Sequence, residues 1–124
     1  MHFDTFSSAL ATLDVDCIAV GVHEASAQGD AEAGPGAAEL DKACGGAIAR
    51  LLKRGDFSGR AGETLLLGEL AGVKATRVLL VGQGSRSGVN RKNWRRAVAS
   101  AIGAASRTQS KKLAVALTRP AAAE

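Results

Sequence analysis

One run constrains the fold of this chain more than any other feature: residues 77–84, which read Arg-Val-Leu-Leu-Val-Gly-Gln-Gly. A strand with one solvent-exposed face alternates apolar and polar residues. Residues 78–81 are all apolar, so both faces of this strand should be buried. A strand covered on both faces belongs in the middle of a sheet with helices on each side. Gly82 and Gly84 then allow a sharp exit and a close backbone approach. Ligands usually bind at this end of strands in open α/β sheets, so the run suggests both a fold and a site.

Three further apolar runs are predicted strands: residues 17–22, 63–70 and 113–117. Because residues 63–70 lie close in sequence to residues 77–81, the two runs should pair antiparallel as a hairpin, which makes the sheet mixed. The segment from Phe3 to Leu10 fits either an edge strand or a short amphipathic lead-in.

Two helices are predicted to flank these strands. Apolar residues from Leu40 to Leu52 recur at the spacing of one helical face, with Gly55 placed as a C-terminal cap. Gly45 and Gly46 would then lie in mid-helix, at a cost of about 1 kcal/mol each. Residues 24–37, small, polar and glycine-rich, are expected to be a loop. The second helix starts after Asn90, a good N-cap, and buries a stripe that contains Trp94, Val98, Ala101, Ile102 and Ala105. The fold class that follows is three-layer α/β/α around a mixed sheet.

Composition limits the kind of protein. A chain of 124 residues with 46% hydrophobic residues is one domain with one core. No stretch is long and apolar enough to span a bilayer, and no signal peptide is visible, so we expect a cytoplasmic protein. Cys17 and Cys44 are far apart in sequence and fit buried free thiols in a reducing compartment.

Charge is divided unevenly along the chain. Residues 1–73 carry 5 Lys/Arg against 11 Asp/Glu, whereas residues 74–124 carry 11 against 1, within a net charge of +4. Such asymmetry favours an acidic partner for the second half. The alternatives are that the halves neutralise each other within the fold, or that the basic half meets another domain.

No catalytic constellation is visible. The glycine loop 82–88 follows a strand, but its third glycine is one place late for GxGxxG, and no acidic residue between Gly84 and Pro120 could bind a ribose. A structural turn is therefore the preferred interpretation of the loop, with a nucleotide-phosphate cradle as the alternative. Neither His2 nor His23 has a partner at metal-ligand spacing, so no metal or cofactor is expected in this chain.

A basic cluster is the positive functional signal. It comprises Arg86, Arg91, Lys92, Arg95 and Arg96. The pairs 91/95 and 92/96 are four residues apart on a predicted helix and so share a face. Clusters of this kind bind phosphate backbones through charge, which makes DNA a candidate partner. A solvated helix face or a contact with a neighbouring domain explains the same residues.

Several stretches together resemble the N-terminal domain of the leucyl aminopeptidases, the cytosol aminopeptidase family, peptidase family M17. They are residues 51–67 (LLKRGDFSGRAGETLLL) and residues 77–84 (RVLLVGQG), with the runs 17–22 and 112–118 in the expected order around them. The resemblance covers nearly the whole chain. It implies a macro-domain-like module spanning residues 1–124, and the chain ends before the last helix and strand of such a module, as an excised or unusually short domain would.

The resemblance also implies a function. In that family the zinc or manganese ions, their carboxylate ligands and the catalytic lysine and arginine belong to a later domain, so no catalytic residue is carried over to this chain. The parent enzymes are homohexamers that release N-terminal amino acids from peptides. The resemblance therefore implies a non-catalytic domain with an assembly or regulatory role, partnered by the catalytic domain of the same polypeptide. Some bacterial members bind DNA, which makes a DNA-binding module the alternative. ADP-ribose binding is not implied, since no matching motif is present.

Overall fold

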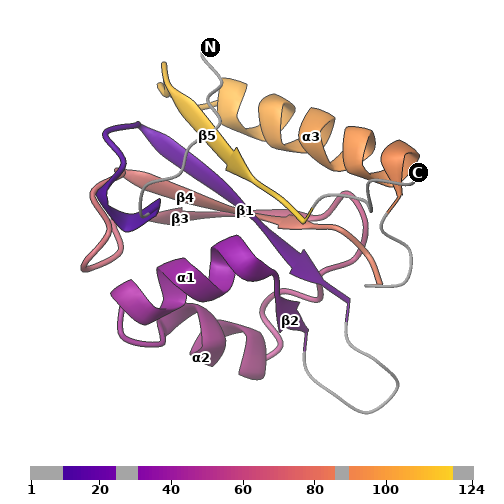
Figure 1. Ribbon diagram of the computed structural model, residues 1–124, viewed down its shortest axis with the longest axis horizontal. Helices are drawn as coiled ribbons and strands as arrows, with labels where there is room; N and C mark the ends of the chain where they lie inside the picture. Colours follow the sequence, from indigo (N-terminus) through magenta and orange to yellow (C-terminus); the bar gives the residue numbers. More distant parts are fainter. Residues whose placement is uncertain (1–9, 25–30, 86–89, 119–124) are drawn as a thin grey trace.

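The computed structural model describes residues 10–24, 31–85 and 90–118 (Figure 1). Its elements, in chain order, are a 3-10 turn η1 (Leu10–Thr12), β1 (Cys17–His23), β2 (Glu32–Ala33), α1 (Pro35–Ala43), α2 (Ala47–Lys53), β3 (Thr64–Gly68), β4 (Arg77–Gly82), α3 (Arg91–Ser106) and β5 (Leu113–Ala116).

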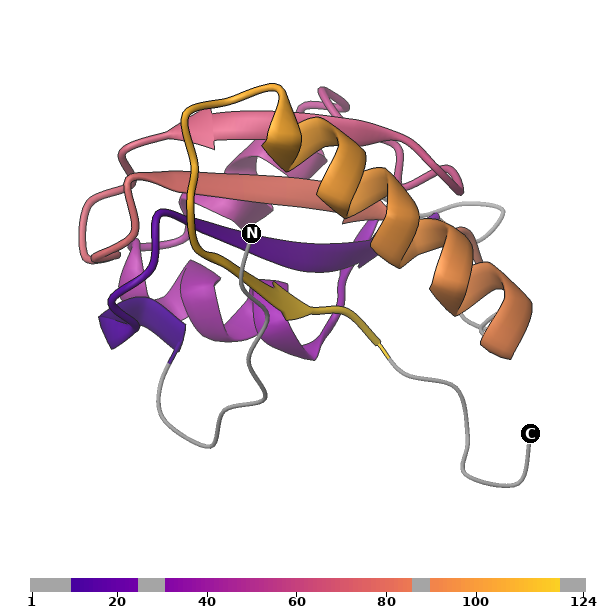
Figure 2. The same cartoon turned by 90° about the horizontal axis from the view of Figure 1, so that it is seen from above.

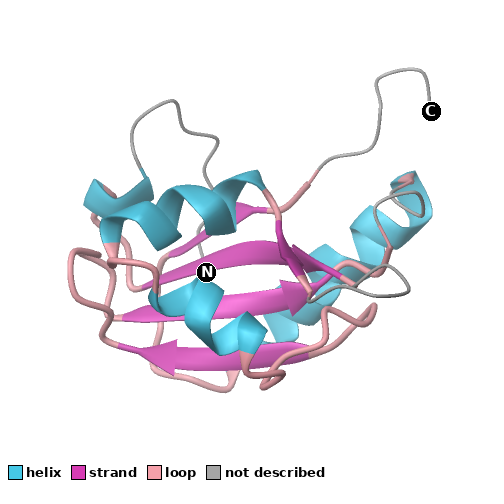
Figure 3. Cartoon of the chain, turned by 90° about the horizontal axis from the view of Figure 1, so that it is seen from below, coloured by secondary structure: helices cyan, strands magenta, loops and turns pink. Residues whose placement is uncertain are grey.

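The five strands form one mixed sheet, as predicted (Figure 3). β1 pairs in parallel with β4 on one side and with β5 on the other, and β2 pairs antiparallel with the last two residues of β1. β3 pairs antiparallel with β4, which confirms the predicted hairpin. β4 therefore lies in the interior of the sheet, between β1 and β3, as its uninterrupted apolar sequence indicated.

Helices cover both faces, which confirms the three-layer α/β/α architecture (Figures 1 and 2). Because side chains alternate along β4, Val78 and Leu80 join the core under α1 and α2, whereas Leu79 and Val81 join the core under α3. All four are at most 1% exposed. Full burial of each such side chain contributes about 1.5–3 kcal/mol, so β4 stabilises both layers at once.

The predicted single helix from Leu40 to Leu52 is wrong: two helices, α1 and α2, occupy this stretch. Gly45 and Gly46 separate them with φ angles of 73° and 85°, in the left-handed region that ends helices. The apolar spacing continues across the break because both helices pack on the same core. The cap predicted at Gly55 is confirmed, since the N–H of Gly55 donates to the carbonyl of Leu52 with φ at 80°.

The loop predicted over residues 24–37 is wrong for residues 32–33 and from residue 35 onward. Glu32 and Ala33 pair with β1 as the short strand β2, and α1 begins at Pro35. Proline suits the first turn of a helix because its missing N–H would lack a partner there anyway. Residues 25–30 and most of the segment from Phe3 to Leu10 lie outside the described residues.

α3 begins as predicted. The side-chain oxygen of Asn90 accepts a hydrogen bond from the N–H of Asn93 at 2.8 Å, the interaction of an N-cap. Ala97, Ala101 and Ala105 are buried, and the remaining apolar residues of the predicted stripe, Trp94, Val98 and Ile102, pack partly buried against the same core. Small alanines allow this helix to lie close to the sheet.

Replacing Gly45 by alanine tests the break between α1 and α2. A side chain at φ 73° is strained, so Gly45→Ala should lower the free energy of unfolding by about 1 kcal/mol, although no neighbouring atom lies within 4 Å of the added Cβ. A continuous helix would instead gain about 1 kcal/mol from the same change. The sign in urea denaturation distinguishes the two. Gly103→Ala, in an open and ordinary helical position of α3, is the matched control and should stabilise the protein.

Candidate functional site

The carboxyl ends of β1, β4 and β5 meet at one edge of the sheet, where the sequence placed a candidate ligand site. Gln83, directly after β4, lies there with only 5% of its surface exposed. Its side-chain nitrogen donates to the carbonyl of Thr118 at 2.8 Å, and its side-chain oxygen accepts from the N–H of Thr118 at 2.8 Å. The amide thus imitates one rung of a β-ladder and joins the end of β4 to the chain leaving β5.

This amide bridge passes over β1 at Gly21. A Cβ on Gly21 would lie 1.8 Å from the side-chain oxygen of Gln83, so only glycine fits under the bridge. The carbonyl of Gly21 accepts the N–H of Gly34 at 2.8 Å, which fixes the residue that precedes α1. The same position therefore orders the sheet edge and the start of a helix.

His23 completes the polar contacts at this edge. It is fully buried, with Nδ1 at 3.3 Å from the carbonyl of Gly84 and Nε2 at 2.9 Å from Oγ1 of Thr118. A carbonyl can only accept, so Nδ1 donates to Gly84, and in the neutral ring Nε2 then accepts from the threonine hydroxyl. Both ring nitrogens are thereby used within the fold, an arrangement typical of a structural histidine.

The glycine loop after β4 uses its backbone in the same way. The N–H of Gly82 donates to the carbonyl of Glu63 at 2.6 Å, that of Gln83 to Val22 at 2.9 Å, and that of Gly84 to Gly59 at 2.9 Å. A Cβ on Gly82 would lie 2.0 Å from the carbonyl oxygen of Arg60, so this strand end is covered by residues 59–63. Phosphate cradles need free N–H groups, and these three are bound to the chain itself. Residues 86–89 of the loop lie outside the described part.

Glu63 holds the covering segment in shape. One oxygen of its carboxylate accepts from the hydroxyl of Ser58 at 2.6 Å, from the N–H of Ser58 at 3.2 Å and from the N–H of Arg60 at 3.3 Å. Burial acts to raise the pKa of Glu63, but these hydrogen bonds favour the ionised form more strongly and the pKa is lowered. The carboxylate therefore remains charged, and its hydrogen bonds stabilise the covering segment.

The two cysteines differ in burial, and Cys17 offers no nucleophile. Both are free thiols, Cys17 buried and Cys44 half-buried. Burial raises the pKa of Cys17 to about 11, which keeps it protonated near neutral pH. In the described residues, no group of three or more histidine, cysteine or carboxylate side chains is placed to hold a metal ion. No described helix is both long enough and apolar enough to cross a bilayer.

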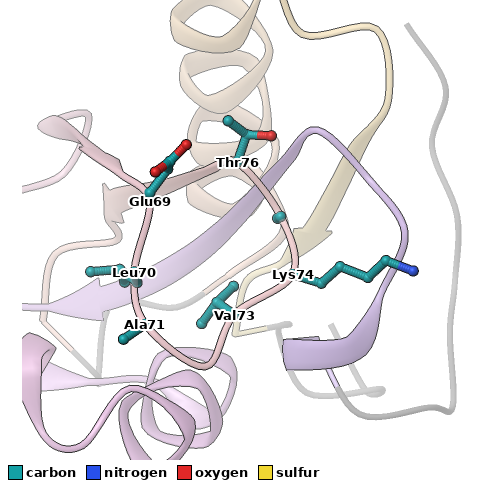
Figure 4. A pocket seen from close by; sticks show the side chains of 7 residues that line it. Glu69, Leu70, Ala71, Val73, Lys74 and Thr76 are labelled. Atoms are coloured by element: carbon teal, nitrogen blue, oxygen red, sulfur yellow. The ribbon is translucent and has the colours of Figure 1, made fainter.

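A shallow depression of about 410 Å³ lies at the turn between β3 and β4 (Figure 4). Its polar side chains do not converge, since Lys74 extends away from the ring of lining residues while Glu69 and Thr76 lie on another side of it. Binding sites for small molecules need convergent polar groups, so this depression is a surface feature of the turn.

The predicted basic cluster lies at the start of α3. Arg91, Lys92, Arg95 and Arg96 are all exposed, whereas Arg86 lies outside the described residues. The first turn of α3 contains no acidic residue, although the positive end of the helix dipole disfavours cations there by about 0.3–1 kcal/mol each. Within the described residues, no ion pair involves Lys92, Arg95 or Arg96. Trp94 is packed against the core, in line with its predicted structural role.

Sequence reasoning assigned no role to Gln83, Gly21 or Thr118, which make the bridge. The available signal was a glutamine between two glycines at the end of a buried strand, where a polar side chain needs a partner. The partner lies 35 residues further along the chain, and local patterns do not reveal it.

Comparison with known proteins gives a family match over most of the chain. The sequence profile described as "Cytosol aminopeptidase family, N-terminal domain" matches residues 19–124. A probable cytosol aminopeptidase of Cupriavidus pinatubonensis is 49% identical over 94 residues, which are 76% of this chain and 18% of that protein. A probable cytosol aminopeptidase of Halorhodospira halophila is 40% identical over 101 residues, 82% of this chain and 19% of that protein. The chain thus spans about a fifth of the length of these relatives.

Two solved structures have the same architecture. A mutant of tomato leucine aminopeptidase superposes with a TM-score of 0.67 at 25% identity, covering 93% of this chain and 22% of that one. The macrodomain of Mycobacterium tuberculosis DarG superposes with a TM-score of 0.63 at 12% identity, covering 92% of this chain and 74% of that one. The second likeness concerns the fold alone and confirms that it is macro-domain-like.

A double-mutant cycle tests the bridge. Gln83→Ala should lower the free energy of unfolding by about 1–3 kcal/mol, because the backbone of Thr118 loses both hydrogen bonds. Gly21→Ala should cost at least as much, since its Cβ expels the amide. The double variant should be more stable than the sum of the two effects predicts, because the shortened side chain at position 83 leaves room for the new Cβ. Additive losses in urea denaturation would contradict the bridge.

Proposed function

The chain belongs to the cytosol aminopeptidase family, as its N-terminal domain, and on that premise we propose that residues 1–124 form the non-catalytic part of a metal-dependent leucyl aminopeptidase, with an assembly or regulatory role. In this proposal the parent protein is a cytoplasmic homohexamer that releases N-terminal amino acids from peptides. A catalytic domain of the same polypeptide holds the zinc or manganese ions, and this domain acts through contacts with its partners.

The observation that carries the proposal is the use of polar groups at the carboxyl edge of the sheet. The side chains of Gln83 and His23 and the N–H groups of Gly82, Gln83 and Gly84 bond to the chain itself. A catalytic or ligand site needs such groups directed toward a substrate. Because the polar groups at this edge bond within the domain, they support the proposal of a structural module. Such a module is suited to a role in assembly.

The proposal predicts that the purified chain does not hydrolyse leucine p-nitroanilide when zinc or manganese is added. Release of nitroaniline should match a blank with metal alone, while the full-length parent is active. Removing this domain from the parent should shift its mass in light scattering below that of the hexamer. Metal-dependent hydrolysis that co-purifies with the 124-residue chain would refute the proposal.

A second candidate function is contact with an acidic partner, DNA among them, through Arg86, Arg91, Lys92, Arg95 and Arg96. The observation that favours it is the exposed concentration of cations at the helix end where the dipole opposes them. No carboxylate occurs between Gly84 and Pro120 to neutralise them locally. Phosphate groups would bind such a surface with little dependence on sequence.

Replacing the four described cations of this surface by alanine tests the second candidate. The variant lacking Arg91, Lys92, Arg95 and Arg96 should bind a short DNA duplex at least roughly tenfold more weakly at about 50 mM salt and with a shallower salt dependence, by fluorescence anisotropy. The control lacks four exposed lysines outside α3, namely Lys42, Lys53, Lys74 and Lys111, and has the same net charge. Equal losses in both variants, or no binding by the wild type, would count against a specific basic surface.

A further inference from the structure

β3 forms an open edge of the sheet. Within the described residues its sole strand partner is β4, and no element covers its other side with hydrogen bonds. Figure 2 shows this strand at the margin of the sheet, beyond β4 and β1. A free edge presents unpaired N–H and C=O groups that another strand can bind.

The hydrogen bonds at the start of β3 determine which backbone groups face outward. The N–H of Gly62 donates to the carbonyl of Gly82 at 3.1 Å, and the N–H of Gly82 donates to the carbonyl of Glu63. With φ at 86°, Gly62 is the first residue of a G1 bulge. Because bonding alternates along an antiparallel pair, residues 63, 65 and 67 face β4. The N–H and C=O groups of Thr64, Leu66 and Gly68 therefore point to the open edge.

Leu66 marks the centre of this edge. Its side chain is 44% exposed, the one large apolar side chain so exposed among the described residues. Its cross-strand neighbour Leu79 is buried in the core under α3, whereas Leu66 remains partly exposed. Protein edges are usually protected by lysine, proline or a bulge within the strand. β3, with the sequence Thr-Leu-Leu-Leu-Gly, contains none of these and pairs with β4 in unbroken register.

We propose that β3 pairs antiparallel with β3 of a second copy of this chain, about a twofold axis at Leu66. The strand is self-complementary in this register: Leu66 lies opposite Leu66, Leu65 opposite Leu67, and Thr64 opposite the small Gly68. The outward backbone groups of residues 64, 66 and 68 meet the same groups of the second copy, as a twofold contact requires. Two sheets then continue as one across the interface.

The two glutamates at the ends of β3 do not directly oppose the pairing in this register. Glu69 of the second copy comes opposite Glu63, next to the exposed Arg60. The carboxylate of Glu63 is turned back onto Ser58 and the N–H of Arg60, so it does not face the incoming strand. A five-residue edge buries far less than the roughly 1,600 Å² of a standard interface, so this pairing is weak and depends on concentration.

This contact adds a surface to the assembly role proposed above, but it rests on the open edge alone. If the isolated chain is monomeric, but deleting this domain from the parent still disrupts the hexamer, the edge pairing is overturned and the proposed function stands. If the isolated chain forms dimers, but deleting the domain leaves the parent hexamer intact, the edge pairing stands and the proposed assembly role is overturned.

Sedimentation equilibrium over a range of concentrations tests the pairing. The wild-type chain should form dimers, and Leu66→Lys should weaken the dimer at least roughly tenfold, because a cation at the centre of the edge is the protection that natural edges use. Leu66→Thr, which keeps a strand-forming residue, should weaken it in the same direction. Ala49→Lys, at an exposed position on α2, is the control and should leave the dimer unchanged. A chain that stays monomeric, or a dimer unaffected by both changes at Leu66, overturns the proposal.

Disulfide formation tests the register. In a Cys44→Ser background, Leu66→Cys places two thiols on residues whose Cα atoms are about 5.5 Å apart, within the range of a disulfide. Thr64→Cys places them about 14 Å apart, because residue 64 pairs with residue 68. The first variant should crosslink under mild oxidation at least roughly tenfold faster than the second. Equal crosslinking rates for the two variants overturn the register. A chain that stays monomeric and instead binds an unrelated extended peptide at this edge also overturns it.

Discussion

The side-chain amide of Gln83 joins two strand ends that the backbone of the sheet leaves separate. β5 pairs with β1 only as far as Val20, after which the short strand β2 replaces it beside β1. By bonding to both backbone groups of Thr118, Gln83 holds the departing chain at the sheet edge where ladder pairing has stopped. This contact leaves no room for a side chain at Gly21, and His23 bonds to the hydroxyl of the same Thr118.

The stretch through which the chain resembles its relatives has a structural purpose. Residues 59–63 cover the end of β4, and the left-handed glycines in that segment allow its backbone to approach Gly82 and His23 closely. Glu63 binds the segment together through one carboxylate oxygen. These residues lie within one of the stretches that resemble the aminopeptidase N-terminal domain, and their contacts close the end of β4.

Local patterns predicted those parts of the fold that local physics determines. β4, its hairpin with β3 and the Asn90 cap depend on neighbours in sequence, and all three are confirmed. The break at Gly45 and Gly46 was missed because the apolar spacing is the same on both sides of it, and only the φ angles distinguish a kinked pair from one helix. The bridge was missed because its partners are far apart in the chain. The basic residues of α3 could be placed on an exposed face from spacing alone, but their partner is not encoded in that spacing.

Closing the strand ends changes where this domain can interact with other molecules. In an α/β sheet the carboxyl edge is the usual site for ligands, because strand ends and helix starts leave polar groups free there. Here those groups are bound internally, and the uncompensated features lie on the surface. They are Lys92, Arg95 and Arg96 near the start of α3, where the helix dipole disfavours cations, and the apolar open edge at Leu66. Both features raise the free energy of the isolated domain, and contact with a partner would lower it again. A fold whose strand ends are bonded internally, and whose surface carries exposed cations and an open strand edge, is suited to assembly with other chains or domains.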